Sequence, residues 1–405
     1  MVSPSNGTER NSIMIDSIQR VGVIGLGVMG FDIAFLYAMK GFPTLAYDAS
    51  GKIMDSFSQR RNGTIERLEK RQRISQSEKA NVLRHLQPAS EINGLAKQDL
   101  VTEAVFESAK VKTAIYRTLK ENGFTGVLTT NTSSLTRELL LNGGTFERKA
   151  FATTHFFNPV LHTRMVELVR GDMEEGNSNL LLSFLEKLER APVETRDISG
   201  FVSNSVLMYY AVMALRLLES GARIDTVDHA AKAMGLLPPF ISFDSWKPSI
   251  VEDVTRVMYG LRGDDFLRSS KLLANLATDN PRFYIEQTPN PAIYQRIKEH
   301  DEKLTETIIK KALKAAIHIA AARVVELGES PDTVDFIAVE GIKIPEAPLE
   351  EIDKVGPPSL LQALVEINRQ MPEISLTPPE LLKTMTHEGQ TFFINGQPNR
   401  RLLST

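Results

Sequence analysis

A short strand, a glycine-rich turn and a helix follow one another near the start of the chain. Val21–Ile24 reads as a buried strand, Gly25, Gly27 and Gly30 match the pattern G-x-G-x-x-G, and residues 31–39 have helical spacing. The first glycine permits a tight turn, the second lets a pyrophosphate approach the backbone, and the third lets the helix pack closely on the strand. Free N–H groups at the helix start favour phosphate. The arrangement therefore predicts an α/β unit that binds a dinucleotide.

A second strand, expected at Thr44–Tyr47, ends in Asp48, eighteen residues beyond Gly30. A carboxylate at this position can accept hydrogen bonds from the hydroxyl groups of an adenine ribose. It would repel a 2'-phosphate, so the sequence favours NAD over NADP. A glycine turn without any ligand is the less favoured alternative, because the turn, the helix, the strand and the acid occur in the expected order.

The length and composition limit the class of protein. A chain of 405 residues exceeds one comfortable core, so two or three domains are expected. The net charge of -3 gives no reason to expect a nucleic acid partner, and no apolar run approaches the roughly eighteen residues of a membrane span. The absence of cysteine excludes disulfides, thiolate nucleophiles and cysteine-bound zinc, and we expect no metal site. Residues 1–19 read as a flexible tail rather than an export signal, so a cytoplasmic protein is expected.

Three further strands are expected at 99–105, 127–130 and 150–156, with helical stretches between them. This alternation predicts a parallel sheet, in which ligands collect beyond the carboxyl ends of the strands. At or just after three of these ends lie polar residues from different parts of the chain, Glu107, Ser134 and His155. A histidine beside two phenylalanines is more often a packed core residue than a catalyst. The shared position at one sheet edge shifts the interpretation of this histidine towards catalysis.

The segment 53–90 has a helical pattern and many basic side chains, namely Arg60, Arg61, Arg67, Lys70, Arg71 and Arg73. Such a run is typical of a solvated helical face. It is equally compatible with a cationic surface for a phosphate-bearing substrate. The spacing alone does not separate the two interpretations.

The last half of the chain has a helical pattern. Residues 198–221 are apolar nearly all round, so we expect a helix that is buried in a core or an interface. Asn204 in its first turn either clamps the helix through a hydrogen bond or contacts a substrate. Residues 219–238 align without gaps on 326–345, including both DTVD runs, and this repeat predicts a duplicated helical domain. The proline-rich residues 278–291 read as the linker between the copies.

These patterns together predict an α/β N-terminal domain followed by two all-α helical domains. The N-terminal domain is expected to be Rossmann-like and doubly wound, over residues 20–198. The first helical copy is expected over 199–300, linker included. The second copy is expected over 301–405, and it begins in a helix at 304–327.

The assembled motifs resemble the L-3-hydroxyacyl-CoA dehydrogenase family from residue 20 onward. The most specific match is HFFNPVLHTRMVELV, in which Glu167 follows His155 by twelve residues. Further matches to the family's motifs are the NTSSL run at 131–135, the pair Glu107 and Lys112, and the GFVSN run that ends at Asn204. The two helical copies are similar to the dehydrogenase part of multifunctional fatty-acid oxidation enzymes.

The resemblance implies an enzyme that uses NAD to oxidise an L-3-hydroxyacyl-CoA to a 3-ketoacyl-CoA, or that catalyses the reverse reduction. It implies that His155 transfers the proton and that Glu167 orients its imidazole. It also implies that Ser134 lines the site and that Asn204 approaches the substrate carbonyl, where each could donate to the substrate oxygen. The residues expected to contact the cofactor are Gly25, Gly27, Met29, Gly30, Asp48, Glu107, Lys112 and Asn158.

Two stretches of the helical part depart from the family pattern. They are MGLLPPFISFDSWKPS after the first repeat and TDNPRFYIEQ at the end of the first copy. Because substrate contacts come largely from these domains, an acyl-carrier-protein thioester and a free 3-hydroxy acid stay open as substrates beside an acyl-CoA. A non-catalytic NAD-binding protein with a structural or regulatory role is the alternative from another class. The second helical copy is compatible with a monomer, and a homodimer also stays open.

Overall fold

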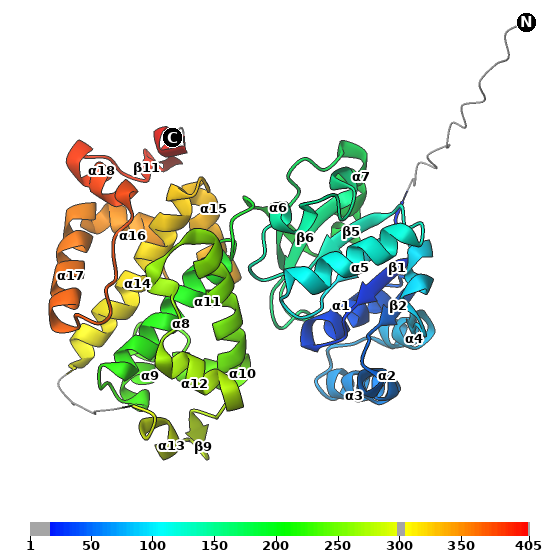
Figure 1. Ribbon diagram of the computed structural model, residues 1–405, viewed down its shortest axis with the longest axis horizontal. Helices are drawn as coiled ribbons and strands as arrows, with labels where there is room; N and C mark the ends of the chain where they lie inside the picture. Colours follow the sequence, from blue (N-terminus) through cyan, green and yellow to red (C-terminus); the bar gives the residue numbers. More distant parts are fainter. Residues whose placement is uncertain (1–16, 298–303, 404–405) are drawn as a thin grey trace, which may run out of the picture.

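The computed structural model of the protein describes residues 17–297 and 304–403. An eight-stranded sheet forms the centre of the N-terminal part (Figure 1). Its strand order is β3-β2-β1-β4-β5-β6-β7-β8, and neighbouring strands are parallel except for β6 and β7. In chain order the strands are β1 Val21–Ile24, β2 Thr44–Tyr47, β3 Leu86–Pro88, β4 Leu100–Glu103, β5 Val127–Thr130, β6 Phe151–Phe156, β7 Met165–Val169 and β8 Ala191–Glu194.

Helices cover both faces of this sheet, which confirms the predicted Rossmann-like, doubly wound domain. The helices of the domain are α1 Val28–Met39, α2 Gly51–Asp55, α3 Phe57–Lys70, α4 Gln76–His85, α5 Ala109–Glu121, α6 Arg137–Leu141 and α7 Glu175–Lys187. Helices α1 and α7 share a hydrophobic core with one face of the sheet, and α5 and α6 share a second core with the other.

Two features of the sheet differ from the prediction. In the segment 53–90, which was expected to be helical, the last helix ends at His85 and Leu86–Pro88 pairs with β2 as an edge strand. An edge position tolerates Pro88, which has no N–H to donate. The sheet is also not wholly parallel. Only residues 157–164 connect β6 to β7, too few for the crossover of a dozen or more residues that a parallel pair needs, so the chain reverses and the two strands pair antiparallel.

The C-terminal part is helical, with two small antiparallel hairpins. We refer to residues 199–297 as the first helical segment and to residues 304–403 as the second. The first contains α8 Ser203–Glu219, α9 Ile224–Ala233, α10 Pro239–Trp246, α11 Pro248–Arg262, α12 Lys271–Asp279, β9 Tyr284–Ile285, β10 Thr288–Pro289 and α13 Pro291–Tyr294. The second contains α14 Glu306–Glu326, α15 Pro331–Phe336, α16 Pro348–Val355, α17 Pro357–Gln370, α18 Glu380–Glu388, β11 Phe393–Ile394 and β12 Gln397–Pro398.

The two helical segments make the same hydrogen bonds at equivalent places. Asp228 accepts from two backbone N–H groups at the start of α10, and Asp335 does the same at the start of α16. Asp244 and Asp353 each accept from two N–H groups where the small hairpin begins. We infer from these matched bonds that the segments are copies of one unit. The interpretation of residues 278–291 as a linker is corrected, because they include the hairpin β9–β10 of the first copy.

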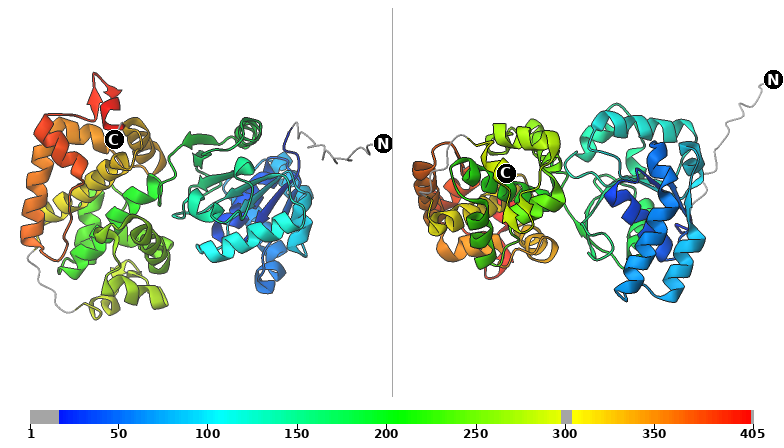
Figure 2. Two further views of the ribbon diagram at one scale, coloured as in Figure 1. Left: turned by 45° about the horizontal axis from the view of Figure 1, so that its top comes forward. Right: turned by 90° about the horizontal axis from the view of Figure 1, so that it is seen from below.

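One hydrophobic core runs through both helical segments, with α8 packed against α14 (Figure 2). Helix α14 carries small side chains, such as Ala316 and Ala320, that are fully buried in this core. The expected boundary between residues 300 and 301 lies outside the described residues, as does most of the expected tail at 1–19. Among the described helices, none combines the length and the apolar character needed to cross a membrane.

Candidate active site

His155 and Glu167 face each other across neighbouring strands. The antiparallel pairing of β6 and β7 places them in register, and His155 Nδ1 lies 2.8 Å from Glu167 Oε2. The twelve-residue spacing in the sequence thus corresponds to a reversal of the chain. Glu167 is fully buried whereas His155 is 8% exposed, so solvent reaches the imidazole and not the carboxylate.

The carboxylate of Glu167 is held by the start of α8. Its Oε1 accepts the backbone N–H groups of Val202 and Ser203, each at 3.0 Å. Its Oε2 accepts the Ser203 hydroxyl at 2.6 Å in addition to His155. The partial positive charge of a helix N-terminus favours an anion at this position. The first helical segment therefore fixes the position of a carboxylate that belongs to the sheet.

Aromatic rings enclose the imidazole of His155. The ring of Phe157 lies 5.6 Å from it, and the ring of Phe201 lies 5.5 Å from it, centroid to centroid. Within residues 17–297 and 304–403, no protein group makes a hydrogen bond to His155 Nε2. Since Nδ1 faces Glu167, Nε2 is the atom of the imidazole that can meet a ligand.

The NTSS run folds around the carboxylate of Glu107. Glu107 Oε1 accepts the hydroxyl of Thr132 at 2.6 Å, the N–H of Ser133 at 2.9 Å, and the N–H and hydroxyl of Ser134 at 2.7 and 2.8 Å. Burial alone would raise the pKa of Glu107, but the charge of Lys112 and these donors outweigh it and lower the pKa. An ionised carboxylate can only accept hydrogen bonds, so the Ser134 hydroxyl donates its hydrogen to Glu107. Towards a ligand, this hydroxyl can therefore only accept.

Lys112 is buried behind this loop. Its ammonium lies 2.7 Å from Glu103 Oε1 and 3.7 Å from Glu107 Oε2, and the side chains of Lys112 and Glu103 are fully buried. Tyr116 and Thr130 donate to the other oxygen of Glu103. In this arrangement the ammonium of Lys112 stabilises the Glu107 carboxylate from the protein interior and is not exposed at the surface.

Asn204 joins α8 to the same loop. Its Nδ2 donates to the carbonyl of Ser133 at 2.9 Å, which is the clamping bond considered from the sequence. The side chain is half-buried and its amide has a second N–H that can serve a ligand. Asn158 lies just beyond β6 and is exposed. Hydrogen bonds thus join His155 to Glu167, Glu167 to the start of α8, and Asn204 on α8 to the loop in which Ser134 contacts Glu107. No such bond joins Asn158 to them among the described residues.

The glycine turn has the geometry that its pattern predicts. Gly25 has φ +87°, and a Cβ on it would lie 2.7 Å from the backbone of Ala104. A Cβ on Gly30 would lie 1.8 Å from the carbonyl oxygen of Gly25, so helix and strand touch there. A Cβ on Gly27 would meet nothing within 4 Å, so this glycine faces open space. Met29, in the first turn of α1, is partly buried.

Two charged side chains bracket the turn. Asp48 accepts the N–H of Leu26 at 2.7 Å and also the N–H of Ser50. Arg60, on α3, donates to the carbonyl of Leu26 at 2.6 Å and to that of Gly27 at 3.1 Å. Its guanidinium also lies 4.1 Å above the ring of Phe31. The turn is therefore fixed on both sides.

The surroundings of the turn fit a dinucleotide. The first N–H groups of a helix have no partner within the helix, so those at the start of α1 are suited to a pyrophosphate. Asp48 lies at the end of β2, where it can meet a ribose. Two apolar side chains near the site, Val28 and Phe106, are 69% and 70% exposed. Together these residues can hold a nicotinamide dinucleotide, with Gly27 leaving room for its phosphates.

Comparison with known proteins gives two adjoining matches to one family. Residues 20–198 match the model of the 3-hydroxyacyl-CoA dehydrogenase NAD-binding domain. Residues 200–282 match the model of the C-terminal domain of the same family. The chain belongs to the 3-hydroxyacyl-CoA dehydrogenase family. Residues 20–198 correspond to the NAD-binding domain of this family.

Individual relatives agree with this family. The chain is 29% identical over 214 residues to the fatty acid oxidation complex subunit alpha of Colwellia psychrerythraea, a match that covers 52% of this chain and 30% of that protein. The (S)-3-hydroxybutyryl-CoA dehydrogenase structure from Ralstonia eutropha is 25% identical, has a TM-score of 0.59 and covers 65% of this chain and 94% of its own. The 3-hydroxybutyryl-CoA dehydrogenase structure from Escherichia coli K12, 20% identical, shares the fold over 92% of this chain and 99% of its own with a TM-score of 0.76.

Sequence reasoning missed three parts of this candidate site. Ser203 contacts Glu167, and its position at the start of an apolar helix was an available signal. Glu103, a charged residue inside a predicted strand, could have been recognised as the buried partner of a lysine. The role of Arg60 at the turn carried no signal, because other basic residues of the same run behave differently: Arg61 on α3 donates to the carbonyl of Leu86, and Arg73 beyond the end of α3 contacts His162.

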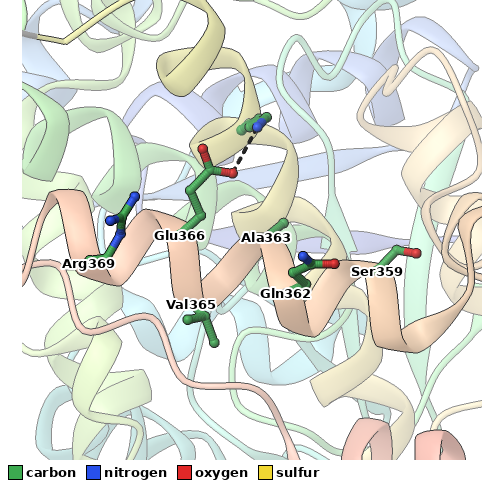
Figure 3. Close-up of a pocket in the computed structure, with 7 residues that line it drawn as sticks. Ser359, Gln362, Ala363, Val365, Glu366 and Arg369 are labelled. Atoms are coloured by element: carbon green, nitrogen blue, oxygen red, sulfur yellow. Dashed lines mark hydrogen bonds and ion pairs between the residues drawn. The ribbon is translucent and has the colours of Figure 1, made fainter.

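A separate depression lies on α17, at the side of the helical part that faces away from the sheet (Figures 1 and 3). Its lining includes Ser359, Gln362 and Arg369, and Glu366 is paired with Lys311 at 2.9 Å. None of the residues that surround His155 contributes to it. This depression is therefore separate from the candidate site around His155.

Proposed function

We propose that the protein oxidises L-3-hydroxyacyl-CoA thioesters to 3-ketoacyl-CoA thioesters with NAD, and catalyses the reverse reduction. The observation that carries this proposal is the His155–Glu167 pair, in which the carboxylate takes Nδ1 and leaves Nε2 for a substrate. The names of the Ralstonia and Escherichia coli relatives support a short 3-hydroxyacyl-CoA as the substrate class.

The proposed mechanism divides the reaction between a hydride and a proton. Bound NAD supplies the carbon that accepts the hydride from the carbinol carbon of the substrate. His155 Nε2 accepts the hydroxyl proton as the C–H bond breaks, so the substrate becomes a ketone and the imidazole becomes an imidazolium. Glu167 stabilises the imidazolium through Nδ1–H, and the donors at the start of α8 keep the carboxylate in place. In the reverse direction His155 returns the proton to the oxygen.

Of the two residues expected near the substrate oxygen, Asn204 is better suited to donate. The Ser134 hydroxyl donates to Glu107, whereas Asn204 uses one of two amide hydrogens on the carbonyl of Ser133. The second hydrogen of Asn204 can stabilise negative charge on the substrate oxygen. Ser134 and Glu107 then hold the loop on which the cofactor and substrate rest.

The exposed basic side chains of α3 favour a carrier that bears phosphate. Arg67 and Lys70 are exposed, as is Arg71 just beyond the helix. Coenzyme A offers phosphates to such a surface and a free 3-hydroxy acid does not. A carrier-protein thioester is the second candidate, because acidic proteins are also attracted to basic surfaces.

The test follows NADH absorbance with three acceptors: acetoacetyl-CoA, the acetoacetyl thioester of an acyl carrier protein, and free acetoacetate. Oxidation of NADH that is fastest with acetoacetyl-CoA supports the proposal. Faster oxidation with the carrier protein or with the free acid replaces it by the corresponding alternative. Binding of NADH without oxidation by any of the three would favour a non-catalytic NAD-binding protein.

A further inference from the structure

Glu329 of the second helical segment reaches the chain that leads into the active site. It lies between α14 and α15 and is 5% exposed. Its Oε2 accepts the backbone N–H of Arg196 at 2.7 Å, across 133 positions of sequence, and its Oε1 accepts the N–H of Ser330 at 2.9 Å. We propose that Glu329 is a positioning residue, through which the second helical segment holds the His155–Glu167 pair in its catalytic geometry. This inference rests on the function proposed above.

The residues 196–203 have little freedom to move once Arg196 is held. Ser199 donates its hydroxyl to the carbonyl of Ser134 at 2.7 Å. Gly200 has φ +83°, and a Cβ on it would lie 2.6 Å from the side chain of Met258 on α11. Phe201 follows, also at a positive φ of +49°. A chain that is tethered on three sides transmits a displacement of one end to the other.

The far end of this segment is what holds the catalytic carboxylate. Val202 and Ser203 supply the N–H groups that Glu167 Oε1 accepts, and Phe201 is one of the rings beside His155. A shift of Arg196 therefore moves the donors of Glu167 and one wall of the imidazole. Misplacement of a catalytic group by about 1 Å can cost on the order of a hundredfold in rate.

A second contact from the same helical segment supports this coupling. Gly341, at the end of the π-helical turn Ile337–Gly341, lies against β7 and the residue after β6. A Cβ on it would be 2.8 Å from the sulfur of Met165 and 3.2 Å from the ring of Phe157. Phe157 is the other ring beside His155. The second helical segment thus touches the supports of the pair on both sides and contributes no group to the reaction.

The charge of Glu329 has to be separated from its position. Burial raises the pKa of Glu329, and the N–H groups of Arg196 and Ser330 oppose this effect while the negative charge of Glu167 adds to it. Glu329→Gln removes the charge and retains an oxygen that can accept from Arg196. Glu329→Ala removes both. If position is what matters, the glutamine variant rescues what the alanine variant loses.

The first experiment compares steady-state kinetics of the full chain with acetoacetyl-CoA and NADH. Glu329→Ala is expected to lower kcat by about tenfold to a hundredfold and to leave KM for NADH within about twofold. Glu329→Gln is expected to keep most of the wild-type kcat. The matched control is Asp353→Ala, which removes a second-segment carboxylate that also accepts two backbone N–H groups, but from partners in its own segment. An equal loss of kcat in the control, or none in Glu329→Ala, overturns the proposal.

The second experiment does not depend on turnover. The exchangeable Nδ1 proton of His155 is observed by proton NMR and assigned by its absence in His155→Gln. Glu329→Ala is expected to shift or broaden this resonance, and Glu329→Gln and Asp353→Ala to leave it unchanged. An unchanged resonance in Glu329→Ala overturns the proposal even if no thioester proves to be a substrate, in which case only the proposed function fails.

A third variant covers the case in which Glu329→Ala does not fold. Glu329→Asp keeps the charge and withdraws the acceptor by one methylene group. It is expected to lower kcat and to alter the His155 resonance, with a melting temperature near that of the wild type. A wild-type kcat and resonance in Glu329→Asp would show that the position of the acceptor is unimportant.

Discussion

At the scale of single residues, His155 has neighbours with different tasks. Glu167 occupies Nδ1, the rings of Phe157 and Phe201 lie beside the imidazole, and Nε2 is left for proton transfer. Glu167 is held by α8 and not by His155 alone. Replacing the histidine therefore leaves the carboxylate with three donors, and the fold does not depend on the imidazole.

The first prediction concerns His155→Gln. We expect this variant to fold, to bind NADH as the wild type does, and to lose turnover by about 100-fold to 10,000-fold, because proton transfer loses its acceptor. Turnover is measured with acetoacetyl-CoA, and NADH binding by fluorescence titration. Near-normal turnover would remove His155 from the mechanism.

The second prediction concerns Arg60, which donates to the carbonyls of Leu26 and Gly27. In Arg60→Ala the glycine turn loses two hydrogen bonds and a positive charge near the expected pyrophosphate. We expect NADH and ADP-ribose to bind about tenfold more weakly, which corresponds to about 1.4 kcal/mol. Adenosine, which has no phosphate, should bind with little change. The control is Lys52→Ala, at an exposed position on α2. If Arg60→Ala binds ADP-ribose as tightly as the wild type does, the prediction is contradicted.

At the scale of elements, the turn between β1 and α1 separates glycines that serve the fold from a glycine that serves the ligand. A Cβ at position 30 would collide with the carbonyl oxygen of Gly25, whereas a Cβ at position 27 would enter open space. We expect Gly30→Ala to lower the melting temperature strongly or to prevent folding. Gly27→Ala should keep the melting temperature and weaken NADH binding. Thermal unfolding and NADH titration of both variants check this, and unchanged NADH affinity in Gly27→Ala would contradict it.

The loop at 131–135 gives a prediction about pH. Burial opposes ionisation of Glu107, but Lys112 and the hydroxyl and N–H donors prevail, and its pKa lies below the ordinary 4.5. A carboxylate with a lowered pKa stabilises the fold above the pKa of the unfolded chain, and this contribution is lost as the pH falls through the folded pKa. Glu107→Gln should therefore melt at a lower temperature at neutral pH and lose less stability on acidification than the wild type. Melting temperatures between neutral and acid pH measure both, and parallel curves would contradict the prediction.

The elements also show what the sequence could predict. The unit of β1, α1 and β2 was predictable because the glycine spacing and the apolar runs are local signals. Strands β7 and β8 were not predicted, and the antiparallel direction of β7 depends on the short connection that precedes it. Lys112 was expected at the cofactor, but its burial against Glu103 depends on how α5 packs against the sheet. The contact of Glu329 with Arg196 joins distant parts of the chain and has no sequence signal.

At the scale of the whole molecule, the two helical segments behave as one folded unit because α8 and α14 share a core. Burial of one Leu-sized or Ile-sized side chain contributes about 1.5–3 kcal/mol, and whole domains are stable by only about 5–15 kcal/mol. Helix α14 buries Ile309, Leu313, Ile319 and many smaller side chains. Removal of α14 therefore costs more free energy than the stability of the first helical segment can offset.

The prediction at this scale is that a chain that ends at residue 303 does not form a stable helical part. Without α14 the apolar side chains of α8 are exposed, and we expect aggregation or a loss of cooperative unfolding. Gel filtration and near-ultraviolet circular dichroism check this outcome. A monomeric truncated protein with a sharp unfolding transition would show that the first helical segment is stable alone.

The hydrogen bonds from Val202 and Ser203 to Glu167 have a consequence for protein engineering. The two family models meet at residues 198–200, which invites the construction of chimeras at that junction. In a chimera cut there, Glu167 comes from one parent protein, and the N–H and hydroxyl groups that it accepts come from the other. A chimera that exchanges the helical part to change acyl-chain preference has to import a helix whose first turn offers two N–H groups and a hydroxyl at the same places. A junction before residue 196 does not remove this requirement, but it keeps Arg196 with Glu329 when α8 and α14 are transferred together.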